Sequence, residues 1–99
     1  MTIDKTHENI TITFTLKGRL DTTTAPKLQE VLIPAFDEAK EVTLDFLDLE
    51  YVSSAGLRVL LVGQKEAKKK GGSLTLTNVS GDVMEVFEMT GFAEMLNIK

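Results

Sequence analysis

Two adjacent serines, Ser53 and Ser54, are the residues of this chain whose types and spacing point most directly to chemistry. They follow an apolar segment that ends at Val52 and precede the small residues Ala55 and Gly56. This order is typical of a strand that turns into a helix, where the first amide N–H groups lack partners and carry a partial positive charge. A serine oxygen there can cap the helix or carry a phosphate. Spacing alone leaves both interpretations open.

Three carboxylates, Asp45, Asp48 and Glu50, precede the serines and are the next candidates for chemistry. Paired carboxylates can bind a metal ion or act as general acid and base. These three lack the ligand spacing of a calcium loop, and the only histidine, His7, lies in a polar N-terminal segment. We therefore predict solvated loop charges here, with no metal, no cofactor and no catalytic residue.

Composition excludes several classes of protein. The chain has no cysteine, which rules out disulfides, thiolate metal sites and cysteine nucleophiles. Its seven glycines match neither the phosphate-binding loop nor the dinucleotide fingerprint. Only 11 basic residues face 15 acidic ones, for a net charge of −4, so a nucleic-acid partner is not expected. The expected partner is a protein.

The N-terminal segment and the hydropathy of the chain indicate the compartment. The first residues lack the apolar core of a signal peptide, and no apolar run approaches the roughly 18 residues that a membrane span needs. We expect no direct membrane insertion, and the cytoplasm is the expected compartment.

Apolar residues alternate with threonines from Ile10 to Leu16, which predicts a strand with one buried face and one wet face. We expect Ile10 on the buried face, and a shorter strand around Ile3 to Lys5 that pairs with it as a hairpin. Lys17-Gly18-Arg19 ends the alternation in a bulge or a turn.

Caps and periodic apolar residues predict the remaining elements. A first helix begins at Asp21 to Pro26 and buries a stripe of Leu28, Val31, Leu32 and Ala35, and Pro34 should kink it or end it early. The other expected elements follow in order: a central strand over Glu41–Phe46, a helix over Ser54–Lys70 with a buried first half, a strand over Ser73–Thr77, a helix over Ser80–Thr90 and an edge strand over Leu96–Ile98. Met84, Met89 and Met95 are interpreted as core filler, with an adaptable contact surface as the alternative.

Strands that alternate with helices predict an α/β fold, and 99 residues suffice for one domain, residues 1–99, but not for a second core. Threonine-lined strands differ from the continuous apolar runs of a sheet that is covered on both faces. We therefore predict a mixed sheet of four to five strands with helices packed mainly on one face.

Four segments together resemble the STAS domain, the family of bacterial anti-sigma-factor antagonists. Leu49–Leu60 is similar to the family motif L-x-[FY]-[MIV]-D-S-S-G-[LI]. The other three are Gly18–Asp21 followed by Thr24-Ala25, the turn at Lys69–Gly72, and Val86–Phe92. The resemblance covers the whole chain in the family's order and spacing, and it implies a single STAS domain with a β/α superhelix-like arrangement.

The resemblance implies a regulatory binding protein rather than an enzyme. Such a protein binds an anti-sigma factor that is also a serine kinase, and so controls sigma-factor-dependent transcription. Phosphorylation of the motif serine breaks the complex, and a phosphatase restores it. The acceptor falls at Ser54, with Ser53 as the alternative because it stands where the family has Asp. The implied partner-binding residues are Asp21, Thr22, Thr23, Thr24, Ser53, Ser54, Ala55, Gly56, Leu57 and Arg58.

Two other functions stay open at this point. Some members of the family are STAS subunits of membrane-associated lipid-transport ATPase complexes and act there as binding modules without phosphorylation. An enzyme of the flavodoxin-like kind is disfavoured because the chain has no cysteine, no histidine pairing and no phosphate loop. The sequence leaves the oligomeric state as monomer or weak dimer.

Overall fold

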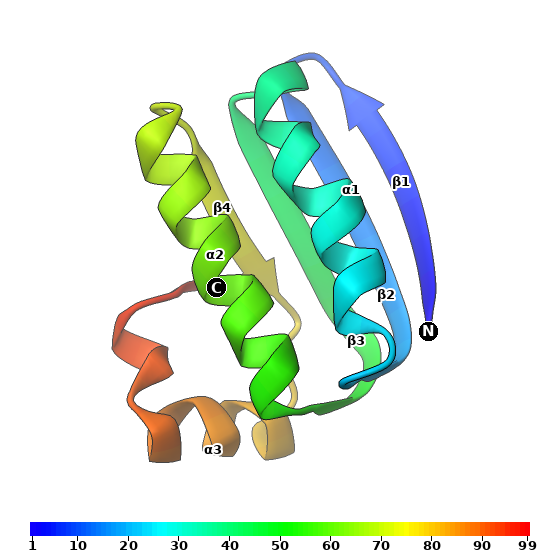
Figure 1. The fold of residues 1–99 in the computed structure, drawn as a ribbon, viewed down its shortest axis with the longest axis vertical. Helices are drawn as coiled ribbons and strands as arrows, with labels where there is room; N and C mark the ends of the chain where they lie inside the picture. The colour runs from blue at the N-terminus through cyan, green and yellow to red at the C-terminus, as the bar shows by residue number, and fades with distance from the viewer.

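Five strands form one mixed sheet in the order β1-β2-β3-β4-β5 in a computed structural model that describes all 99 residues (Figure 1). β1 runs antiparallel to β2, and every other neighbouring pair is parallel. The elements are β1 (Thr2–Glu8), β2 (Thr11–Leu20), α1 (Ala25–Glu38), β3 (Glu41–Val52), α2 (Ser54–Lys69), β4 (Ser73–Thr77), α3 (Gly81–Thr90), a 3₁₀ turn (Phe92–Glu94) and β5 (Asn97–Ile98). The predicted mixed α/β sheet is confirmed.

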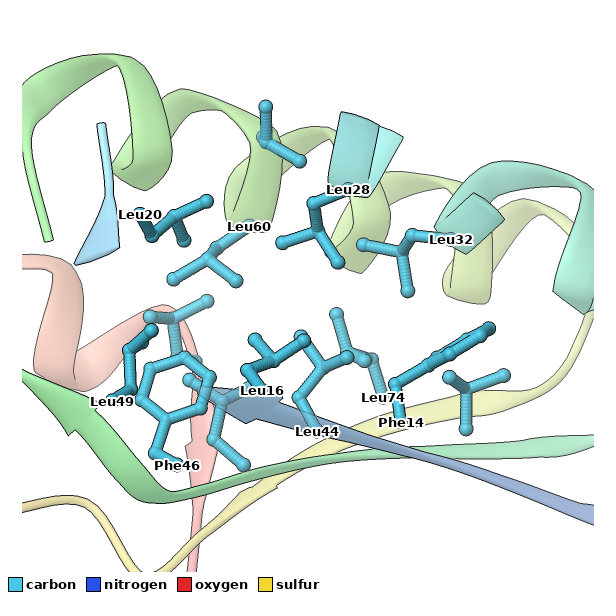
Figure 2. Close-up of a cluster of buried hydrophobic side chains, with 14 of the residues drawn as sticks. Phe14, Leu16, Leu20, Leu28, Leu32, Leu44, Phe46, Leu49, Leu60 and Leu74 are labelled. Atoms are coloured by element: carbon cyan, nitrogen blue, oxygen red, sulfur yellow. The ribbon is translucent and has the colours of Figure 1, made fainter. Parts of the chain in front are cut away.

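Helices α1 and α2 lie side by side on one face of the sheet, and α3 lies at the end where α2 begins (Figure 1). Leu28 and Leu32 of α1 and Leu60 of α2 point toward the inward side chains of the strands, including Phe14 and Leu44 (Figure 2). The opposite face carries a row of threonines in register, Thr6, Thr13, Thr43 and Thr75. The alternation of the strands therefore identified the buried face.

The first hairpin is longer than the sequence predicted. β1 pairs with β2 along its whole length, from Thr2 to Glu8. Ile10, expected on the buried face, is 55% exposed because Asn9 turns the chain with φ 54° and β2 begins only at Thr11. At Gly18, φ is 105° and β2 continues to Leu20, so this position is a bulge and not a turn.

β3 also exceeds its prediction, because two bulges carry it from Phe46 to Val52. It gains one residue on β2 between Thr15 and Lys17 and another between Gly18 and Arg19. The carboxylates Asp45, Asp48 and Glu50 therefore lie on this strand and not in a loop. Asp48 and Glu50 are exposed, while Asp45 accepts hydrogen bonds from the Asn78 side chain and the Leu47 N–H, both at 3.0 Å.

Pro34 neither ends nor shortens α1, which continues to Glu38 and buries Phe36. Its ring lies on the exposed side of the helix. The carbonyl four residues earlier, which loses its N–H donor because proline has none, can there be hydrogen-bonded by water. Of the predicted stripe, Leu28, Leu32 and Ala35 are buried, but Val31 is 38% exposed, because the buried side of the helix continues through Ala25 and Phe36.

In the last third of the chain, the predicted helix caps are present, but two of the methionines predicted to be buried are exposed. Ser80 caps α3 by accepting from the Val83 N–H at 3.2 Å, and Gly91 ends it with φ 79°. Met89, interpreted as core filler, is 79% exposed, and Met95 is exposed as well.

Candidate functional site

Ser53 is the N-cap of α2, and both its backbone and its side chain are engaged. Its Oγ accepts a hydrogen bond from the Gly56 N–H at 3.3 Å, and its carbonyl accepts the Leu57 N–H at 2.9 Å. Its own N–H donates to the Leu20 carbonyl at 2.9 Å. Ser53 therefore fastens the start of α2 to the end of β2 and satisfies one of the free amides of the helix.

Ser54 is the first residue of α2, and its side chain is exposed. Its hydroxyl makes no hydrogen bond within the chain, in contrast to the half-buried Ser53. The field of the helix start favours an anion at this place. Of the two serines, Ser54 is thus the one that can accept a group from another protein without disturbing the cap.

Gly56 brings the start of α2 against β2 because it has no side chain. A Cβ at this position would lie 2.7 Å from Leu20 Cγ and 3.1 Å from the Leu20 carbonyl oxygen. The conformation at Gly56 itself is ordinary, so the requirement for glycine is one of space. The close approach brings the loop that follows β2 near the start of α2, where Thr22 of the loop and Ala55 of the helix line one groove.

Asp21 organises that loop through its carboxylate. Oδ1 accepts from the Thr23 N–H at 3.0 Å, from the Thr23 hydroxyl at 2.8 Å and from the Thr24 N–H at 3.2 Å. The hydroxyl of Thr23, above all, holds the pKa of the Asp21 carboxyl below its usual 3.8, because it binds the charged form. Thr22 and Thr23 are left exposed at the tip of the loop.

Thr24, which the family resemblance implies as a partner-binding residue, is buried and hydrogen-bonded within the loop. It is 9% exposed, and its Oγ1 donates to the Arg19 carbonyl at 2.8 Å while accepting from the Asp21 N–H at 2.8 Å. Gly56 and Leu57 are buried too. These three residues shape the surface, and the other members of the predicted set are exposed or half-buried.

A groove of about 420 Å³ joins the two predicted segments between the N-terminal halves of α1 and α2. Thr22 lies at its loop end, Ala55 and Arg58 line the α2 wall, and Glu30 and Gln29 line the α1 wall. The α1 wall is not among the residues predicted from the sequence, where its only signal was the polar, exposed face of an amphipathic helix.

Arg19 and Tyr51 also lie near the site without being among the residues predicted from the sequence. They are paired in register across β2 and β3, and the Arg19 guanidinium carbon lies 4.2 Å from the centre of the Tyr51 ring. Arg19 Nε also lies 3.9 Å from Asp21 Oδ2. This cation is therefore held at the base of the Asp21 loop.

The arrangement offers an exposed hydroxyl, a groove and a cation, and it places no histidine beside them, since His7 lies on the edge strand β1. No three histidine or carboxylate side chains gather closely enough to hold a metal ion. None of the helices combines the length and the apolar character that crossing a bilayer requires.

The sequence profile described as STAS domain matches residues 2–99. This chain belongs to the STAS domain family. The STAS chain is 34% identical over 94 residues to the anti-sigma-B factor antagonist of Bacillus subtilis, covering 95% of itself and 85% of that relative. The family resemblance inferred from the motifs is confirmed, and the STAS chain stands among the anti-sigma factor antagonists.

Solved structures confirm the fold. The unphosphorylated form of the anti-sigma factor antagonist SpoIIAA matches with a TM-score of 0.78 at 18% identity, over 99% of the STAS chain and 87% of that chain. The phosphorylated form of the Bacillus cell fate determinant SpoIIAA matches with a TM-score of 0.77 at 19% identity, over 99% and 91%. At these identities the likeness concerns the fold alone.

Proposed function

We propose that this STAS domain is a non-enzymatic switch that binds a kinase-type anti-sigma factor and is released by phosphorylation of Ser54. Release would return the anti-sigma factor to its sigma factor, and a phosphatase would reset the switch. The anti-sigma-B factor antagonist of Bacillus subtilis supports the class of partner. The observation that carries the proposal is the exposed, unengaged hydroxyl of Ser54 at the first position of α2.

Ser54 is a better acceptor than Ser53 on physical grounds. The oxygen of Ser53 holds the Gly56 N–H, and a phosphate there would have to replace a cap worth about 1 kcal/mol. The oxygen of Ser54 accepts no such hydrogen bond. A kinase could reach it without unfolding the first turn of the helix.

Phosphorylation at Ser54 can act without a change of fold. A phosphoserine adds about −1.5 to −2 charges, which the positive end of the α2 dipole favours. The STAS chain resembles the two forms of SpoIIAA almost equally, which is consistent with one fold that tolerates both states. Phosphorylation would then weaken the binding of the partner, because a new anion at the surface repels acidic groups of the partner and must be desolvated in an interface.

The proposed partner surface combines the loop tip at Thr22 and Thr23 with Ser54, Arg58 and the groove between α1 and α2. Asp21 and Ser53 hold its two halves in place through the hydrogen bonds described above. Loops fixed on a rigid scaffold are typical of binding surfaces.

The test is to incubate the protein with ATP and its candidate anti-sigma kinase, then to measure the intact mass and map the modified residue. We expect one phosphate on the native protein and on Ser53→Ala, and none on Ser54→Ala. A phosphate on Ser53 would move the acceptor by one residue. No phosphate, together with tight binding to a lipid-transport ATPase complex, would replace the proposal with the alternative function.

A further inference from the structure

Arg58 is an unpaired cation one helical turn after Ser54. Its side chain is exposed and lines the groove between α1 and α2, where Glu30 lies on the other wall. The ion pairs of the chain are Lys5 with Glu38, Arg19 with Asp21, and Lys70 with Asp37, so neither Arg58 nor Glu30 has a partner within 4.0 Å.

We propose that Arg58 clamps the phosphate on Ser54 and, in doing so, leaves the groove. This inference rests on the proposed phosphorylation of Ser54 and adds its mechanism. Phosphorylation then changes two charges of the partner surface at once: an anion is added at the start of α2, and a cation is withdrawn from the groove.

The positions of the two residues on α2 allow the clamp. Residues at i and i+4 are neighbours on one helix face, about 5–6 Å apart at Cβ. Helical side chains lean toward the N-terminus, so the long side chain of Arg58 extends back over the turn that holds Ser54. A guanidinium group offers parallel N–H donors that match two oxygens of a phosphate.

The other arginine of the chain is already engaged. Arg19 lies over the Tyr51 ring and beside the Asp21 carboxylate. Moving it toward Ser54 would break both contacts, whereas moving Arg58 breaks no hydrogen bond and no ion pair. Of the two arginines, Arg58 is for this reason the one that a phosphate on Ser54 would recruit.

The groove changes character when Arg58 leaves it. In the unmodified protein its walls carry one positive and one negative side chain, Arg58 and Glu30. After withdrawal of Arg58, Glu30 remains and the groove is acidic. A partner segment with a carboxylate that fits the unmodified groove would then meet repulsion from the groove as well as from the phosphate.

The test uses protein in which phosphoserine is incorporated at position 54 during translation, so it depends on no kinase. A ³¹P NMR titration measures the second pKa of the phosphate, which is ordinarily about 6. A nearby cation favours the dianion and lowers this pKa. We expect this pKa to be about 0.3 higher in Arg58→Gln than in the native sequence. In Arg58→Lys, which keeps the charge, it should lie below the value of Arg58→Gln.

The matched control is Lys65→Gln, which removes the same charge from an exposed position farther along α2. It should leave the phosphate pKa at the native value. Equal pKa values in the native protein and Arg58→Gln would overturn the clamp, and so would an equal rise in Lys65→Gln, since that would be a general charge effect.

A second readout follows Arg58 itself. In ¹⁵N NMR spectra the Nε–H signal of Arg58 should shift and exchange more slowly with water once Ser54 carries phosphate. An unchanged signal would contradict the clamp. A failed kinase reaction would instead contradict the proposed function and leave both of these measurements interpretable.

Discussion

Gly56 lies against Leu20, and this contact brings the two halves of the proposed switch surface together. A side chain on Gly56 would meet Leu20 Cγ at 2.7 Å, while the neighbouring Ser53 donates its N–H to the Leu20 carbonyl at 2.9 Å. The end of β2 and the start of α2 are thus fixed by a steric contact and a hydrogen bond. Because the Asp21 loop follows β2 and Ser54 begins α2, this junction positions both of them.

Gly56→Ala should therefore destabilise the protein by about 1–3 kcal/mol, since the added methyl group must displace Leu20 in a packed region. Urea unfolding measures the change. Gly81→Ala is the matched control, because Gly81 also lies in the first turn of a helix but has open space around it. Equal stability of the two variants would contradict the close packing at Gly56.

The two serines should differ in their effect on stability. Ser53→Ala removes the cap and should lower the free energy of unfolding by about 1 kcal/mol. Ser54→Ala removes a hydroxyl that holds nothing and should stay within about 0.5 kcal/mol of the native protein. Thermal and urea unfolding of both variants provide the measurement, and a larger loss for Ser54→Ala would reverse the roles assigned to them.

Asp21 should make the protein acid-sensitive in a definite direction. Its folded pKa lies below 3.8, chiefly because of the Thr23 hydroxyl, so the unfolded chain binds the proton more readily. The stabilisation is present above about pH 3.8 and is lost as the pH falls through the folded pKa. Stability measured against pH should show a smaller drop in this range for Asp21→Asn. An equal drop would show that the Asp21 hydrogen bonds carry no pH dependence.

The sequence predicted most of the fold because its alternation is regular where the sheet is regular. Phe14 and Leu16 are buried and Thr15 between them is not, as the period of two requires. The prediction failed at the end of β3, where bulges place Leu47 and Asp48 on the surface in succession. A bulge depends on how a strand pairs with its neighbour, and the hydropathy pattern of one segment does not show this pairing.

The site was predicted only in part, for a similar reason. The order of Ser53 and Ser54 indicated a helix start, but their separate roles depend on which oxygen reaches the Gly56 N–H. The α1 wall of the groove, with Glu30, depends on how α1 packs beside α2. Such packing between distant segments is a property of the tertiary structure and not of local spacing.

The most direct test of the switch is the affinity of the anti-sigma kinase for the protein with and without phosphoserine at position 54, measured by calorimetry. The unmodified protein and Ser54→Ala should bind alike. The phosphoserine form should bind at least about tenfold more weakly, a loss of about 1.4 kcal/mol, with an unchanged circular dichroism spectrum. Equal affinity of the two forms would contradict the account.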